Sequence, residues 1–176
     1  MLFNQMFRAA RLDRKLYTEL FFDSYATGNA VVVVALVYAV IYLGFMVAGV
    51  RFDLIGFLWF LFGGLVGWLI AAGALWLAST KVFSGRGQGA TAVRLSGFAH
   101  TPLIFIAFAF VSPVGLAQGL AFLALVWFGL GLALAARAMF DLDTRQSALS
   151  ALIAIAIWVV VQVATSFGTD VLSYIF

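Results

Sequence analysis

Three groups of residues in this sequence have types and spacing that could do chemistry. His100 is the single histidine and lies in an apolar stretch, where a neutral imidazole can ligate the metal of a haem or chlorin or relay a proton. A haem site draws on a second ligand or a dedicated pocket, and the chain has no second histidine and no cysteine. We therefore expect His100 to be a satisfied polar contact, and we expect no cofactor and no metal site.

The other two groups are a glycine-rich run and a pair of carboxylates. The run Gly85–Gly89 lacks the following Lys-Ser/Thr pair and the preceding strand of a phosphate-binding loop, so it predicts a flexible turn. Asp141 and Asp143 have the chemistry to hold a divalent ion or to transfer protons. They neighbour two arginines, however, and Asp143 is a natural N-cap for the helix that follows. We expect capping and local charge pairing from them.

The composition restricts the class of protein. The chain has 176 residues, of which 65% are hydrophobic and 10% charged, and its mean hydropathy is +1.14. Soluble chains are about 45–50% apolar and about 25% charged, so a water-soluble globular domain is excluded. The strongly apolar stretches contain no Asp, Glu, Lys or Arg of the kind that ion-coupled carriers use, and no intramembrane hydrolase constellation. We expect neither an enzyme nor a nucleic-acid partner.

Five stretches are long enough to cross a bilayer, whose hydrocarbon core of about 30 Å needs about 20 apolar residues. They are residues 29–49, 54–78, 93–112, 115–136 and 148–167. The third is ambiguous, because its strongly apolar part, Pro102–Val111, is too short to span alone. It is either a full helix with a proline kink or a re-entrant segment.

Charge counting distinguishes these two topologies. Lys and Arg concentrate in short cytoplasmic loops of membrane proteins. With five spans and a cytoplasmic N-terminus, nine cationic residues face inside and Arg51 alone faces outside. Without the third crossing, the ratio falls to seven to three. We therefore predict an all-α integral membrane protein with five transmembrane helices in residues 29–176, the N-terminus inside and the C-terminus outside.

Residues 1–28 have the pattern of an amphipathic helix. Apolar residues recur at helical spacing on one face, and polar residues that include Arg8, Arg11 and Lys15 lie opposite. This pattern predicts an interfacial helix whose three cations contact anionic lipid head groups. The helix is either an anchor that keeps the N-terminus inside or a surface for a partner protein or for sensing lipid packing.

Small residues recur inside the predicted spans. Glycine lets helix backbones approach closely, which drives association where the solvent is already apolar. The glycines expected to pack helices, either within one bundle or against other subunits of a homo-oligomer or larger complex, are Gly63, Gly67, Gly115, Gly119, Gly129 and Gly131.

Three short motifs follow one another along nearly the whole chain. A helical N-terminal segment leads directly into the first span, and the run Gly97–Pro102 (GFAHTP) opens the third. Trp127 lies in the fourth span, and a short polar connector and an alanine-bearing fifth span follow. In these features the chain resembles the Yip-one (Ypt-interacting protein one) domain family of integral membrane proteins.

The resemblance implies a non-enzymatic protein with five spans and a cytoplasmic N-terminus. Eukaryotic members take part in vesicle trafficking, bind Rab-type GTPases and are linked to membrane shaping. Those members carry a longer cytosolic N-terminal region, and without it we do not expect Rab-type GTPase binding here. The compact chain is more similar to prokaryotic members, which implies a bacterial plasma membrane.

Two functions fit these features. The first is a non-catalytic scaffold that organises its membrane, alone or as an accessory subunit of a larger membrane complex. The alternative is a small oligomeric channel or carrier with a pore between protomers. Such a pore would be lined by the polar side chains available in the spans, which are His100, Thr101, Gln118 and Gln162.

Overall fold

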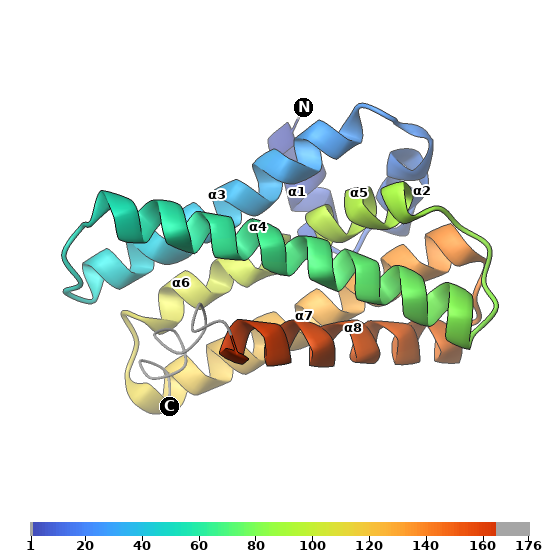
Figure 1. Ribbon diagram of the computed structural model, residues 1–176. Helices are drawn as coiled ribbons and strands as arrows, with labels where there is room; N and C mark the ends of the chain where they lie inside the picture. Colours follow the sequence, from blue (N-terminus) through green and yellow to red (C-terminus); the bar gives the residue numbers. More distant parts are fainter. Residues whose placement is uncertain (1, 165–176) are drawn as a thin grey trace.

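The computed structural model describes residues 2–164, and in this part of the chain all regular secondary structure is helical (Figure 1). In chain order the elements are α1 (Leu2–Ala10), α2 (Arg14–Phe22), α3 (Ala26–Val47), α4 (Leu54–Leu77), the π-helical turn η1 (Ala78–Val82), α5 (Gly89–Ala99), the 3-10 helix η2 (Thr101–Phe105), α6 (Ile106–Ala109), α7 (Val114–Phe140) and α8 (Thr144–Ala164). Five helical stretches within the described residues are long and apolar enough to cross a membrane, which confirms the predicted all-α class.

The five long stretches alternate in direction, so their connections gather at two ends of the bundle (Figure 1). Helix α2, the α4–α5 connector and the α7–α8 turn share one end, and the α3–α4 and α6–α7 turns share the other, while α1 runs from α2 over the third span. The five stretches are Ala26–Val47, Leu54–Val82, Gly89–Ala109, Val114–Phe140 and Thr144–Ala164. Several extend beyond the predicted bounds, whereas the first and the third end before the predicted residues 49 and 112. The predicted end of the fifth span, at 165–167, lies outside the described residues.

Acidic residues set the starts of several helices. The carboxylate of Asp53 accepts hydrogen bonds from two backbone N–H groups in the first turn of α4, and Asp13 does the same for α2 with one. Asp143 accepts from the backbone N of Gln146 at 2.7 Å, and the Gln146 amide accepts in return from the Asp143 N–H. The predicted N-cap at Asp143 is therefore confirmed, and Asp141 ends α7 in the left-handed conformation.

The third span is the most deeply buried of the five and lies at the centre of the bundle. It runs as α5, η2 and α6, and it packs against α3, α4 and α7. The chain leaves the α-helix at His100 because Pro102 has no N–H to donate, and the next turn is 3-10. A full-length helical segment with a proline break, rather than a short re-entrant one, is thus the arrangement found.

The N-terminal segment differs from the single helix predicted for residues 1–28. It forms two short helices, and the chain turns between them at Leu12, whose φ is +56°. Asp13, which interrupts the helical periodicity of the sequence, starts the second helix by capping it. We call α1 and α2 together the N-terminal pair. It packs against the third span and α7, with apolar residues on its inner side.

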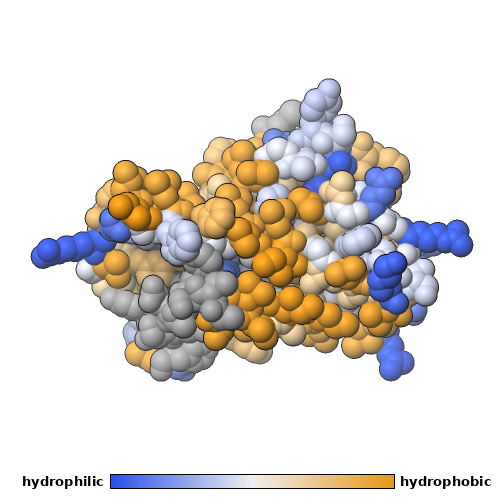
Figure 2. Space-filling view, in the orientation of Figure 1, coloured by the Kyte–Doolittle hydropathy of each residue, from blue (hydrophilic) through white to orange (hydrophobic). Residues whose placement is uncertain are grey.

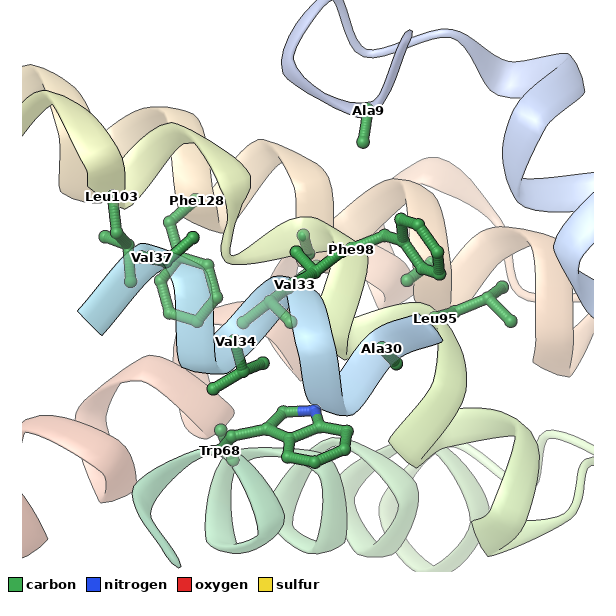
Figure 3. Packing of buried hydrophobic residues seen from close by; sticks show 14 of the residues in the cluster. Ala9, Ala30, Val33, Val34, Val37, Trp68, Leu95, Phe98, Leu103 and Phe128 are labelled. Carbon is green, nitrogen blue, oxygen red and sulfur yellow. The ribbon is translucent and has the colours of Figure 1, made fainter. Parts of the chain in front are cut away.

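The core is formed where α3 meets the third span and α4. Figure 3 shows valines of α3 facing Trp68 of α4 on one side and Phe98 and Leu103 of the third span on the other. On the face that Figure 2 shows, apolar side chains cover the middle of the bundle, whereas the most hydrophilic residues lie toward its ends. This distribution is that of a protein whose flanks contact lipid or other apolar helices.

Candidate functional site

His100 lies at the break in the third span and is completely buried. Its Nδ1 is 2.8 Å from the carbonyl oxygen of Ser96, and its ring lies 4.6 Å from the Phe128 ring, centroid to centroid. A carbonyl only accepts hydrogen bonds, so Nδ1 carries the proton and the neutral ring has its lone pair on Nε2. That Nε2 has no hydrogen-bond partner.

The helix break explains the bond between His100 and Ser96. The backbone N–H of His100 donates to the Gly97 carbonyl, three residues back, instead of the Ser96 carbonyl four residues back. The imidazole then donates to the Ser96 carbonyl that the break leaves without a backbone donor. His100 therefore caps the end of α5 with its own side chain.

The geometry limits the chemistry that His100 supports. A haem or chlorin ligand needs an open coordination position beside Nε2, whereas this side chain is fully enclosed and lies against Phe128. Among residues 2–164 there is no group of three or more His, Cys, Asp or Glu residues that could hold a metal. The ring is thus partly satisfied within the chain, through Nδ1 alone.

The other polar groups around His100 bond inside the same helix or to α4. The Trp68 indole N–H donates to the Ser96 hydroxyl at 3.0 Å and to the Val93 carbonyl at 3.1 Å. Thr101 donates its hydroxyl to the Phe98 carbonyl at 2.8 Å. The Trp68 bonds tie α4 to the third span.

The motif Gly97–Pro102 has a packing role at each position that faces a neighbour. A Cβ built on Gly97 would lie 2.6 Å from the Cβ of Ala30, so α3 and α5 are in backbone contact there. Ala99 packs against Gly131 of α7, where a Cβ on Gly131 would lie 3.1 Å from that of Ala99. The motif thus lets the third span pack closely between α3 and α7, and it ends the helix α5.

Arg94, at the start of the predicted third span, is a functional candidate that the sequence did not single out. It lies in α5 and is buried, and its guanidinium donates to the Thr27 hydroxyl at 3.2 Å. It also donates to the backbone carbonyls of Leu20 and Phe21 at 3.2 and 3.0 Å. These carbonyls end α2, so Arg94 joins the N-terminal pair to the third span and to the start of α3.

The glycines predicted to pack helices fall into two groups. Those within the bundle meet neighbouring helices: Gly67 faces Trp158 and Gln162 of α8, Gly129 faces Ile155 of α8, Gly131 faces α5, and Gly63 is buried on α4. Gly115 and Gly119 lie exposed on α7, with nothing within 4 Å of an added Cβ. Their role in contacts with another molecule stays a prediction.

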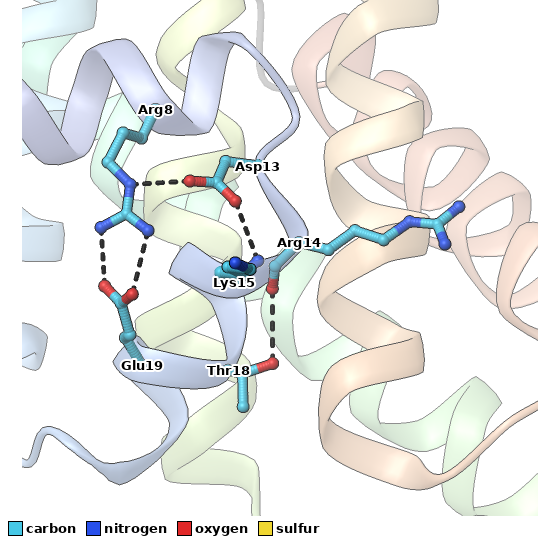
Figure 4. Close-up of polar contacts among 6 residues, drawn as sticks. All are labelled: Arg8, Asp13, Arg14, Lys15, Thr18 and Glu19. Atoms are coloured by element: carbon cyan, nitrogen blue, oxygen red, sulfur yellow. Dashed lines mark hydrogen bonds and ion pairs between the residues drawn. The ribbon is translucent and has the colours of Figure 1, made fainter.

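The cations predicted to contact lipid head groups have different surroundings. Figure 4 shows Arg8 between Asp13, at 2.7 Å, and Glu19, whose two oxygens lie 2.6 and 3.0 Å from it. Hydrogen bonds from this guanidinium lower the pKa of both carboxyls below their usual range. Arg11 lies 5.4 Å from the centroid of the Phe7 ring, and Lys15 is exposed. Arg8 is committed to ion pairs, whereas Arg11 and Lys15 remain at the surface.

The four residues proposed to line a pore between protomers do not share one surface. His100 and Thr101 are buried inside the bundle. Gln162 donates to the Tyr38 hydroxyl at 3.0 Å, which joins α8 to α3, and Gln118 lies half-buried on α7. The glycine-rich connector is largely exposed, and Gly85 and Gly87 lie against Phe140 at the end of α7.

The fold and these contacts define an α-helical membrane protein with five potential spans and a broken central helix. The Yip1 domain model matches residues 3–165, nearly the whole chain, so the protein belongs to the Yip1 domain family. The comparisons with curated proteins and with solved structures return no match.

Proposed function

We propose that the protein is a non-catalytic scaffold that organises its membrane, acting as an accessory subunit of a larger membrane complex. The observation that carries the proposal is how the buried polar side chains are used. His100, Thr101 and Arg94 bond to backbone carbonyls of their own chain, so they brace the fold. The outer faces of α4 and α7, in contrast, are apolar and exposed in the part of the chain that the structure describes.

We place the protein in a bacterial plasma membrane with its N-terminus in the cytoplasm. Nine of its ten lysines and arginines lie at the end that holds α2, the α4–α5 connector and the α7–α8 turn. Arg51 is the tenth and lies in the turn at the opposite end. The positive-inside rule assigns the nine-cation end to the cytoplasm.

The N-terminal pair is proposed to meet anionic lipid head groups at this end. Arg11 and Lys15 carry this contact, because Arg8 is held by Asp13 and Glu19. Phe3 and Phe7 point outward from α1, with 75% and 61% of their surfaces exposed, and provide apolar contact beside the charges. Aromatic residues next to cations suit the membrane interface, where both the ring and the charge find a favourable partner.

The outer face of α7 is the proposed contact for another subunit. Gly115 and Gly119 are one helical turn apart and open to close approach by a partner helix. Leu116, Phe122 and Leu123 are exposed beside them and would be buried in such a contact. This surface serves a different subunit in our proposal, and a second copy of the chain is the alternative that the test below separates.

The test is crosslinking of intact native membranes followed by purification of the tagged protein. We expect one or more other membrane proteins in fixed ratio to the wild-type chain, and loss of that partner in the G115L/G119L variant. Gly28→Leu is the matched control, since an added side chain there also enters open space, on α3 instead. A partner retained equally by both variants would overturn the α7 assignment, and a crosslinked homo-oligomer alone would overturn the accessory role.

An oligomeric channel or carrier remains the alternative from the sequence. It is less well supported, because His100 and Thr101 lie inside the bundle and not on an outer face. Flux through liposomes that falls when Gln118 and Gln162 are substituted would favour it, whereas unchanged flux would remove it.

A further inference from the structure

The two helices of the N-terminal pair are held to each other by their own residues. The Arg8 guanidinium of α1 binds Glu19 of α2 through two nitrogens and Asp13 of the turn through a third. Asp13 also caps α2 by accepting from the Lys15 N–H at 2.9 Å. A bidentate Arg–carboxylate pair fixes geometry as well as position. The pair therefore has an internal frame that does not depend on the rest of the bundle.

The inner side of the pair carries contacts that oppose each other. Met6, Ala9, Leu16 and Leu20 are buried against the bundle and favour docking. Tyr17 is also fully buried, but its hydroxyl has no hydrogen-bond partner. The side-chain oxygen of Gln5 is likewise buried without a partner. Water would satisfy both groups on release, so they favour undocking.

Arg94 supplies the polar contact that holds the pair in place. Within the described residues, the side-chain hydrogen bonds between the pair and the bundle are those that Arg94 donates to Leu20 and Phe21. No carboxylate pairs with this buried cation in the part of the chain that the structure describes. It is compensated instead by the partial negative charge of the carbonyls that end α2.

We infer that Arg94 is a latch: it stabilises the N-terminal pair docked on the third span, and its loss shifts the pair toward a form that leaves the bundle as a unit. Arginine is suited to this position because its planar fork reaches acceptors in α2 and in α3 at once, and a lysine ammonium has no such fork. The Nε group anchors to Thr27 of α3 while Nη1 reaches the two α2 carbonyls. The latch gives the cation-rich end of the protein a docked and a released form.

Distances between spin labels test this inference, and the chain has no native cysteine to interfere. Labels at Thr18 of α2 and Gln88, both exposed, report the pair relative to the bundle. Labels at Gln88 and the exposed Ala148 of α8 report the bundle itself. The full chain is measured in liposomes as the wild type, as R94M and R94K, and as the control R137M, which removes an exposed arginine of α7.

We expect a single narrow Thr18–Gln88 distance in the wild type and in R137M. In R94M we expect a second, broad population, with the docked-to-released ratio reduced at least about tenfold, which is what losing one hydrogen bond to a charged group produces. R94K should lie between the wild type and R94M. Y17F, which removes the unpartnered hydroxyl, should keep the narrow distance.

Two results would overturn the latch. One is an unchanged Thr18–Gln88 distance in R94M. The other is equal broadening of the Gln88–Ala148 distance, which would mean that Arg94 supports the whole bundle instead of a separable pair. Neither readout depends on a partner complex, so a failure of this inference can be distinguished from a failure of the proposed scaffold role.

Discussion

Replacing Gly97 with alanine perturbs the closest approach between the third span and α3. An added Cβ would lie 2.6 Å from the Cβ of Ala30, 3.2 Å from its Cα and 3.3 Å from its carbonyl oxygen. Two of these three atoms belong to the backbone, so rotating a side chain does not relieve the clash and one helix must move. Overpacking of this kind costs about 1–3 kcal/mol of unfolding free energy.

Thermal unfolding of the purified protein in detergent measures this cost. For a chain of this size, a loss of about 1–3 kcal/mol lowers Tm by about 2–12 °C. Gly73→Ala in α4 is the matched control, because nothing lies within 4 Å of its added Cβ. That variant should match or slightly exceed the wild-type Tm, since alanine is the better helix former by about 0.5–1 kcal/mol.

A second substitution separates the steric effect from a general loss of stability. Ala30→Gly removes the atom closest to the new Cβ, so the double variant G97A/A30G should be destabilised by less than the sum of the two single changes. A Tm of G97A equal to that of G73A would refute the close contact. Strict additivity in the double variant would refute the assignment of the cost to Ala30.

Three further predictions concern pH, topology and His100. Because Arg8 lowers the folded pKa of Asp13 and Glu19, their ion pairs contribute full stability above the unfolded carboxyl pKa of about 4 and lose it as the pH falls through the lower folded values. A spin label at Thr18 should therefore gain mobility only below about pH 4, and a gain that begins above pH 5 would contradict this. An impermeant maleimide added to intact cells should label a cysteine at Arg51. A cysteine at Gln88 should be labelled only when the cytoplasmic side of the membrane is opened to the reagent. Labelling of both from one side would exclude five crossings. His100→Leu should lower the unfolding free energy by about 1–3 kcal/mol, because it leaves the Ser96 carbonyl without a donor, and His100→Gln should lower it by less. The wild-type protein should purify without a visible absorption band. A Leu variant as stable as the wild type would contradict the capping role, and a visible band that disappears with His100 would show a bound cofactor.

The predicted spans depended on long apolar stretches, and the structure has a helix at each of the five. The sequence signal was weakest at helix ends. Gln88 makes no side-chain cap bond to α5, so nothing in the sequence marked Gly89 as the start of a helix. The predicted third span therefore begins at residue 93, later than the helix, and the burial of Arg94 was not predicted. The signal for the turn between α1 and α2 was present in Asp13, an N-cap residue that interrupts the apolar pattern.

The contacts that hold the centre of the bundle were harder to predict. Spacing identified Gly67 and Gly131, which meet neighbouring helices, but not Gly64, whose added Cβ would overlap the Tyr38 ring. Which face of a helix meets which neighbour is a tertiary property that a single sequence does not encode locally. The same holds for Tyr17, which is buried against Gly131 although the two are far apart in the chain.

Gentle native purification of the tagged protein from its own membranes, with mass and composition determined together, is the most direct test of the accessory role. A scaffold or accessory subunit predicts stoichiometric co-purification with at least one other membrane protein. A species of 19.0 kDa, or a homo-oligomer of it, that contains no other protein would contradict the accessory role.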